Sequence, residues 1–272
     1  MRITPSGKYR KGYVMKCARM LTVASLATII TLGATAQPVE AQENQSWWRV
    51  IVVQVKPERL ADFNELYREE INPALRKAGV PWRSAWQTGE FGETYERLFV
   101  TPLESFAELD AGGPLARALG PREFDRVLDK LRRSTDRRQA YAVLYRSDLS
   151  VESDDVSGLP IARVTNVEVA PGRGAEFEGF LRNNLSTFQE SDVVFGVYQR
   201  QFGPGPVVWQ IVENLRSYSE LARGGILRAF GDESGRAATA LSGVVTSVER
   251  TVLEYDPTLS FTAVTEPPGR ED

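Results

Sequence analysis

The feature that most constrains the fold is a short stretch that occurs twice, at residues 103–113 (LESFAELDAGG) and 215–225 (LRSYSELARGG). In each copy a serine is followed three residues later by a glutamate, as Ser105 and Glu108 and again as Ser217 and Glu220. This spacing is typical of a capping box, in which both side chains bind free N–H groups at a helix start. Both copies end in a glycine pair, which favours the end of a helix. The sequence therefore predicts the same short helix twice.

The duplication extends over most of the chain. Residues matched 110–114 positions apart are Arg49/Arg163, Val55/Val169, Pro57/Pro171, Ala61/Ala175, Phe63/Phe177, Trp86/Tyr198, Gln87/Gln199, Tyr145/Tyr255, Leu149/Leu259 and Ser150/Ser260. The offset shrinks gradually, as small differences in loop length require. A register kept over this distance indicates an internal repeat.

Each repeat has the same predicted order of elements. In the first, strands are expected at 48–55, 82–88, 95–101 and 139–145, with helices from Pro57 to Gly79, at the capping box and over 121–133, and with a kink at Pro73. In the second, strands are expected at 163–169, 193–199 and 207–213, with a helix over 177–188. Strand, helix, strand, strand, helix, strand is the ferredoxin-like β-α-β-β-α-β unit.

The strands carry apolar residues on both faces, as in the run RVIVVQV at 49–55. Helices cover only one face of a ferredoxin-like sheet, so the other face requires a partner. We therefore predict an α+β fold in which two antiparallel sheets pack face to face as an intramolecular α+β barrel. The predicted divisions are a signal peptide at 1–41, repeat 1 at 46–146, a linker at 147–160, repeat 2 at 161–257 and a disordered tail at 258–272.

The first residues have the pattern of a secretory signal peptide. Six basic residues precede an apolar stretch at 20–32, and ATA at 34–36 or VEA at 39–41 is an acceptable cleavage site. Its removal leaves 27 Lys+Arg against 35 Asp+Glu, a net charge of −8. We expect an exported protein, periplasmic or secreted, with no membrane span after cleavage; a single-helix anchor is the alternative. The acidic charge disfavours nucleic acid as a partner, and Cys17, the one cysteine, lies in the signal.

Each repeat opens with Val-x-Val-x-Pro-x-x-x-x-x-Phe, at 53–63 and 167–177. This pattern resembles the dimeric α+β barrel superfamily, and within it the antibiotic-biosynthesis-monooxygenase and NIPSNAP-like families, over about 46–146 and 160–257. The resemblance implies a fused pair of subunits, a monomer with a pseudo-dimeric barrel, with further oligomerisation left open. Haem-degrading relatives hold iron through histidine, whereas this chain has none. We expect no cofactor and no metal site.

Candidate site residues are polar or aromatic side chains in otherwise apolar strands. The catalytic candidates are Glu168, Arg97 and Asn166, and the ligand-binding candidates are Trp86, Gln87, Tyr95, Tyr198, Gln199 and Trp209. A buried carboxylate such as Glu168 has its pKa raised towards the range of a general base. The alternatives are structural: the glutamines would pair between repeats, the aromatics would form core, and Arg97 would pair with a helix carboxylate.

Three functional hypotheses follow. The first is an exported protein that binds a small apolar or aromatic molecule between sheet and helices. The second is a cofactor-independent monooxygenase or isomerase that uses Glu168 as base, and the third is a structural or assembly module of the cell envelope.

Overall fold

The computed structural model describes residues 46–153 and 159–262. The predicted signal peptide lies outside the described residues. In the first half the elements are β1 (Trp47–Val55), α1 (Leu60–Leu66), α2 (Asn72–Lys77), β2 (Trp82–Thr88), β3 (Glu96–Leu103), α3 (Gly113–Ser134) and β4 (Thr135–Tyr145). In the second half they are β5 (Ile161–Val169), α4 (Gly174–Asn183), α5 (Leu185–Glu190), β6 (Gly196–Phe202), β7 (Val208–Leu215), α6 (Ser234–Ala240), β8 (Val245–Tyr255) and β9 (Phe261–Thr262).

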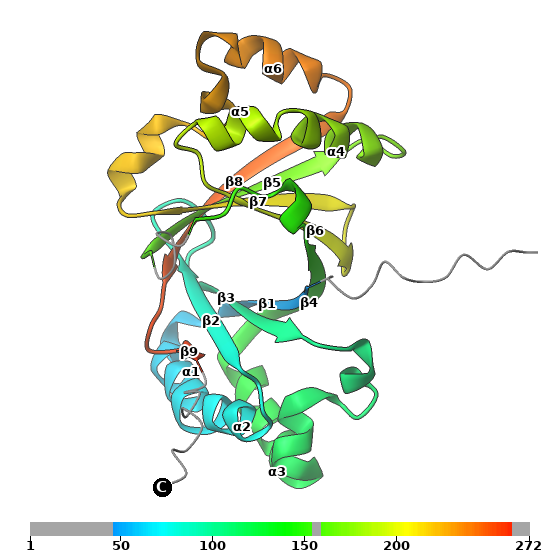
Figure 1. The fold of residues 1–272 in the computed structure, drawn as a ribbon. Helices are drawn as coiled ribbons and strands as arrows, with labels where there is room; N and C mark the ends of the chain where they lie inside the picture. Colours follow the sequence, from blue (N-terminus) through cyan, green and yellow to red (C-terminus); the bar gives the residue numbers. More distant parts are fainter. Residues whose placement is uncertain (1–45, 154–158, 263–272) are drawn as a thin grey trace, which may run out of the picture. The chain divides into compact units, whose positions relative to one another are not determined.

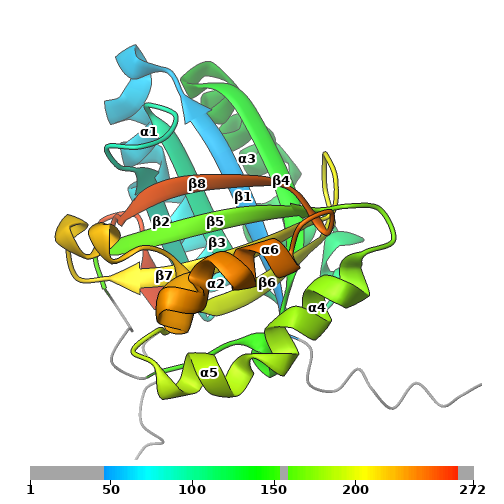
Figure 2. The same cartoon turned by 90° about the horizontal axis from the view of Figure 1, so that it is seen from above.

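Eight of these strands close into an antiparallel barrel. The neighbours run β3-β1-β4-β6-β7-β5-β8-β2, and β2 pairs with β3 to complete the circle. Helices α1–α3 cover the strands of the first half and α4–α6 cover those of the second (Figures 1 and 2). The prediction of an α+β barrel is confirmed. The structure adds that the sheets are hydrogen-bonded to each other at both edges, through β4–β6 and β2–β8.

The repeated sequence motif forms a 3₁₀ turn in both halves. The turn Phe106–Leu109 has the complete capping box of Ser105 and Glu108. The turn Tyr218–Arg223 has only half of it, because Glu220 accepts from the Arg216 N–H while the Ser217 side chain makes no capping bond. Pro73 follows a π-helical turn, Tyr67–Ile71, that separates α1 from α2, as its missing N–H predicts.

Each half has its own core between sheet and helices. In the first, Phe63, Phe99 and Val127 are fully buried; in the second, Phe177, Phe188 and Trp209 are. Phe99 on β3 and Trp209 on β7 alternate with side chains that face the barrel interior, since successive strand residues point to opposite faces. The protein therefore has three separate interior regions. Each half has one core between its sheet and its helices, and the barrel encloses a third space.

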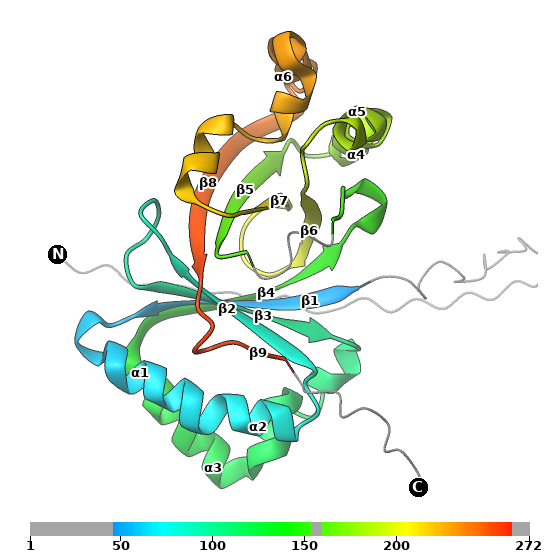
Figure 3. The same ribbon diagram turned by 60° about the vertical axis from the view of Figure 1, so that its left-hand side comes forward.

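The segment that leaves each half completes the core of the other. After β8 the chain passes to β9 beside β2, and Leu259 and Phe261 are buried in the first core (Figure 3). After β4, Leu149 is buried in the second core. Ser150 accepts from the Val197 N–H at 2.9 Å, and Ser260 accepts from the Ala85 N–H at 2.8 Å. We call residues 146–151 and 256–261 the first and second exit segments.

This exchange corrects one predicted boundary. Residues 258–262 were expected in a disordered tail, but Leu259, Ser260 and Phe261 are buried and β9 is a strand. The reason is that the tail supplies apolar side chains to a core formed mostly by residues far away in the sequence. Residues 263–272 of the predicted tail, and 154–158 of the predicted linker, lie outside the described residues.

Truncating Leu259 should test the exchange. Leu259→Ala leaves a cavity in the first core and should lower the free energy of unfolding by about 2–5 kcal/mol. Leu109→Ala, at a position that is 40% exposed, is the matched control and should change it by about 0.5 kcal/mol or less. Denaturant unfolding measures both, and equal small effects would contradict the proposed role of the second exit segment.

Candidate functional site

A cavity of about 620 Å³ lies between the sheet and the helices of the second half. Its walls come from β5, β7 and β8 on one side and from α4, α6 and the preceding 3₁₀ segment Ile226–Glu233 on the other. Most of the lining is apolar, with Phe177, Phe180 and Ile226 among it. This volume is within the range of small-molecule sites in proteins.

The sequence explains why this space is open in the second half. In the first half Tyr67 and Phe99 stack with ring centroids 4.4 Å apart, and the Arg83 guanidinium lies 4.1 Å above the Phe99 ring. At the offsets of the repeat, Leu181 and Ile211 replace Tyr67 and Phe99. Both smaller residues line the cavity. The helical cover is also shorter, since α6 has 7 residues whereas α3 has 22.

A buried ion cluster forms one end of the cavity. Glu213, on β7, accepts from Arg163 Nε at 2.8 Å and Nη2 at 2.7 Å, and from Arg228 Nη1 at 2.8 Å. Glu213 and Arg163 are 1% and 5% exposed, so water screens this pair little. Arg163 also donates to the carbonyls of Leu221 and Gly224. The cluster therefore anchors the loop that closes this end of the cavity.

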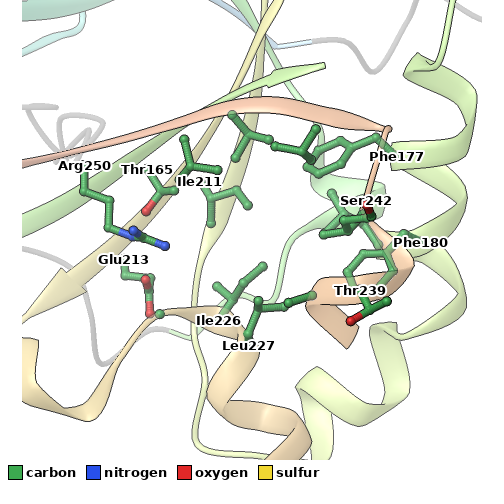
Figure 4. A pocket seen from close by; sticks show the side chains of 17 residues that line it. Thr165, Phe177, Phe180, Ile211, Glu213, Ile226, Leu227, Thr239, Ser242 and Arg250 are labelled. Atoms are coloured by element: carbon green, nitrogen blue, oxygen red, sulfur yellow. The ribbon is translucent and has the colours of Figure 1, made fainter. Parts of the chain in front are cut away.

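Arg250, on β8, lies at the same end and is exposed. Figure 4 shows Arg250, Thr165 and Glu213 together, with Phe177 and Phe180 at the opposite end. Within the described part of the chain Arg250 has no ion pair, whereas both oxygens of Glu213 are occupied by guanidinium N–H groups. The described lining of the cavity is thus mostly apolar, with the unpaired Arg250 guanidinium at one end.

The structure places two predicted ligand-binding residues, Trp86 and Tyr198, on the other face of the sheets. Both line the barrel interior. They lie at the two seams between the halves, where Trp86 is paired with Tyr255 and Tyr198 with Tyr145. Burial raises the pKa of Tyr198, and burial together with the Glu152 contact raises the pKa of Tyr145 to about 12.

Gln87 and Arg97 belong to a polar network at the β2–β8 seam. Arg97 donates to Gln87 Oε1, and Gln87 Nε2 donates to Glu254 Oε2 at 2.9 Å. Tyr218 OH donates to Glu254 Oε1 at 2.7 Å, and the Tyr218 and Gln87 bonds hold the pKa of Glu254 below its usual value. Burial lowers the pKa of Arg97, against the attraction of Asp256, 4.0 Å away. This network joins the halves.

The other candidates are dispersed. Trp209 is fully buried in the second core, and Gln199 accepts from Gln201 Nε2 at 2.6 Å. Tyr95 is 43% exposed and has a positive φ of 63° at the turn before β3. Glu168 is half-buried near the end of β5 and lines neither this cavity nor the barrel interior. Asn166 accepts from Gln210 Nε2 at 2.9 Å. The nine candidates therefore do not form one site.

Residues 46–153 and 159–262 contain neither a cluster of metal ligands nor a membrane-spanning helix. No group of three or more His, Cys, Asp or Glu side chains there could hold a metal ion. No helix in the same ranges is long and apolar enough to cross a membrane.

No protein-family profile matches the sequence, and no curated protein does. Solved structures do match. An anthrone oxidase-like protein is 13% identical with a TM-score of 0.56, covering 84% of this chain and 98% of its own. A candidate monooxygenase from Lactobacillus acidophilus NCFM is 8% identical with a TM-score of 0.52, covering 80% and 96%. A candidate chlorite dismutase, TA0507, is 8% identical with a TM-score of 0.50, covering 78% and 96%. At this level of identity the likenesses show the fold alone, an α+β barrel.

The residues that shape the cavity do not stand out in the sequence. Arg163 is visible there only as a repeat match, and Glu213 only as the end of a predicted strand. One signal was present. Alternate residues of a strand point to the same side, so Glu213 shares the helix-facing side of β7 with the apolar Trp209 and Ile211. A carboxylate on that side requires a cation, and Arg163 is paired with it across β5–β7.

Removing one partner of the cluster should be costly. Glu213→Ala leaves Arg163 buried without an anion and should lower the free energy of unfolding by about 3–5 kcal/mol. The double variant with Arg163→Met should lose less than the sum of the single changes, because the two side chains are coupled. The exposed pair Arg132–Asp129 is the control: Asp129→Ala should cost about 1 kcal/mol or less. Additive effects in denaturant unfolding would contradict the coupling.

Proposed function

We propose that this protein binds a small molecule with an apolar body and an anionic end in the cavity of the second half. The observation that carries the proposal is the 620 Å³ cavity itself, whose counterpart in the first half is occupied by Tyr67, Phe99 and Arg83. An apolar wall supplies affinity, and a single cation at one end supplies orientation. Arg250 is that cation.

Binding is better supported than base-catalysed chemistry. A general base must be positioned to take a proton from the substrate. Glu213, the carboxylate of the cavity, is held in the ion cluster by three guanidinium N–H bonds, and Glu168 does not line the cavity. The monooxygenase alternative rests on the fold shared with the structural neighbours, and a fold hosts many activities.

We infer that each half is a ferredoxin-like repeat and that the chain is of the antibiotic-biosynthesis-monooxygenase or NIPSNAP-like type. The support is the element order of each half and the Val-x-Val-x-Pro-x-x-x-x-x-Phe pattern at each first strand. We also infer export of the chain, from the basic and apolar pattern of its first residues. The closure of the barrel within one chain supports a monomer with a pseudo-dimeric barrel, with further oligomerisation left open.

Two naphthalene derivatives test the ligand class. 2-Naphthoate should bind at least ten-fold more tightly than the neutral 2-naphthamide, because only the carboxylate pairs with Arg250. Arg250→Met should abolish this difference, whereas Arg122→Met, at an exposed arginine on α3, should preserve it. Ala238→Phe, which places a ring into the cavity from α6, should weaken both ligands. Calorimetric titration measures the affinities, and equal binding of both ligands to the unaltered protein would refute the proposal.

Export is tested by the mass of the mature chain. Expressed in full in a bacterial host, the protein should be recovered from the periplasm or medium without its first 36 or 41 residues, the two acceptable cleavage sites. Intact-mass spectrometry identifies the new first residue. Recovery of the uncut chain from the membrane fraction would support the single-helix anchor instead.

A further inference from the structure

A second cavity, of about 490 Å³, lies inside the barrel. Its walls are the side chains that point away from the helices, contributed by strands of both halves. Val164 and Val212 face it, whereas Thr165 and Ile211, their neighbours in the sequence, face the cavity of the second half. The β5–β7 sheet therefore separates the two cavities.

The interior cavity is lined by aromatic rings. They are Trp48, Trp82, Trp86, Tyr141, Tyr198 and Tyr255. Trp48 packs against Trp82 with centroids 5.3 Å apart and against Tyr198 at 4.8 Å. Unlike Phe63 or Trp209 in the helix-side cores, these rings are only half-buried. Their remaining surface faces the cavity, where it is available to another flat apolar molecule.

Among the described residues, the lining of this cavity has no charged side chain. It consists of apolar residues, tyrosines, amides and hydroxyls. Transfer of an ion into such surroundings loses hydration without gaining a counter-charge, so a charged ligand is disfavoured. The same surroundings impose a much smaller cost on a neutral aromatic molecule.

One polar group gives the cavity a recognition element. Gln210 Nε2 donates to Asn166 Oδ1 at 2.9 Å and to the Tyr141 hydroxyl at 3.5 Å. These contacts fix the amide so that Gln210 Oε1, which has no donor among the described residues, is an available acceptor. The Tyr141 hydroxyl accepts in this arrangement and keeps its own proton for donation.

We propose that the barrel interior is a second binding site, which takes a neutral, planar aromatic molecule with an N–H, hydroxyl or carbonyl group. Aromatic rings provide stacking on both sides, and Gln210 with Tyr141 provides one acceptor and one donor. The site is formed by both halves together, since Trp86 and Tyr198 lie on different repeats. It is independent of the function proposed for the helix-side cavity.

Two fluorescent probes distinguish the sites, because they share a ring system and differ in charge. N-phenyl-1-naphthylamine is neutral and has one N–H, whereas 1-anilinonaphthalene-8-sulfonate is its anionic counterpart. The neutral probe should quench the tryptophan emission by energy transfer, since three of the five tryptophans line the interior cavity. The sulfonate should bind there at least ten-fold more weakly.

Variants assign each signal to a cavity. Val212→Phe extends a ring into the barrel interior and should weaken the neutral probe at least ten-fold, whereas Ala238→Phe should leave it unchanged. Gln210→Leu, which keeps the size of the side chain, should weaken it several-fold. Circular dichroism and melting curves establish that each variant is folded, and Val164→Phe is an alternative to Val212→Phe on the neighbouring strand.

The outcomes are decisive in both directions. Loss of the neutral probe in either phenylalanine variant of the interior, with retention in Ala238→Phe, supports the site. Binding that survives both interior variants, binding lost in Ala238→Phe, or absence of energy transfer in the unaltered protein overturns it. Failure of 2-naphthoate to bind the helix-side cavity would leave this result unaffected.

Discussion

The structure depends on hydrogen bonding between two strand pairs that join its halves, β4–β6 and β2–β8. A four-stranded antiparallel sheet has two edges with unpaired N–H and C=O groups, which favour association with other chains. Each half of this chain satisfies the edges of the other, and the barrel that results has no free edge among its eight strands. The enclosed cavity and the outward position of both helical layers follow from this closure.

The exit segments strengthen the same connection. Leu149 and Leu259 are fully buried in the core of the opposite half, and Ser150 and Ser260 each accept an N–H from a strand of that half. The serine and leucine matches were visible in the sequence, but they predicted only a repeat. Their roles could not be predicted, because the pattern of a sequence does not say whether a buried leucine packs within its own repeat or in its neighbour.

The order of elements and the barrel were predictable because they depend on local periodicity and on apolar residues on both strand faces. The site was less predictable. Trp86 and Gln87 were grouped as site residues, yet adjacent strand residues face opposite sides, so Trp86 faces the barrel interior and Gln87 the seam network. The cavity of the second half exists because Leu181 and Ile211 are smaller than Tyr67 and Phe99, which stand at the matching positions of the first half. The difference in size matters only because Tyr67 and Phe99 stack in the first core, and that contact is known only from the structure.

The unequal cores have a consequence for how such a protein evolves. In a symmetric dimer of identical subunits, every substitution occurs in both, so a change that opens a cavity weakens two cores at once. Fusion removes that coupling. Here the first half has the Tyr67–Phe99 stack, whereas the second half has a cavity at the corresponding place. The packed core of the first half, which β9 completes, therefore offsets the loss of stability that an open cavity imposes on the second half.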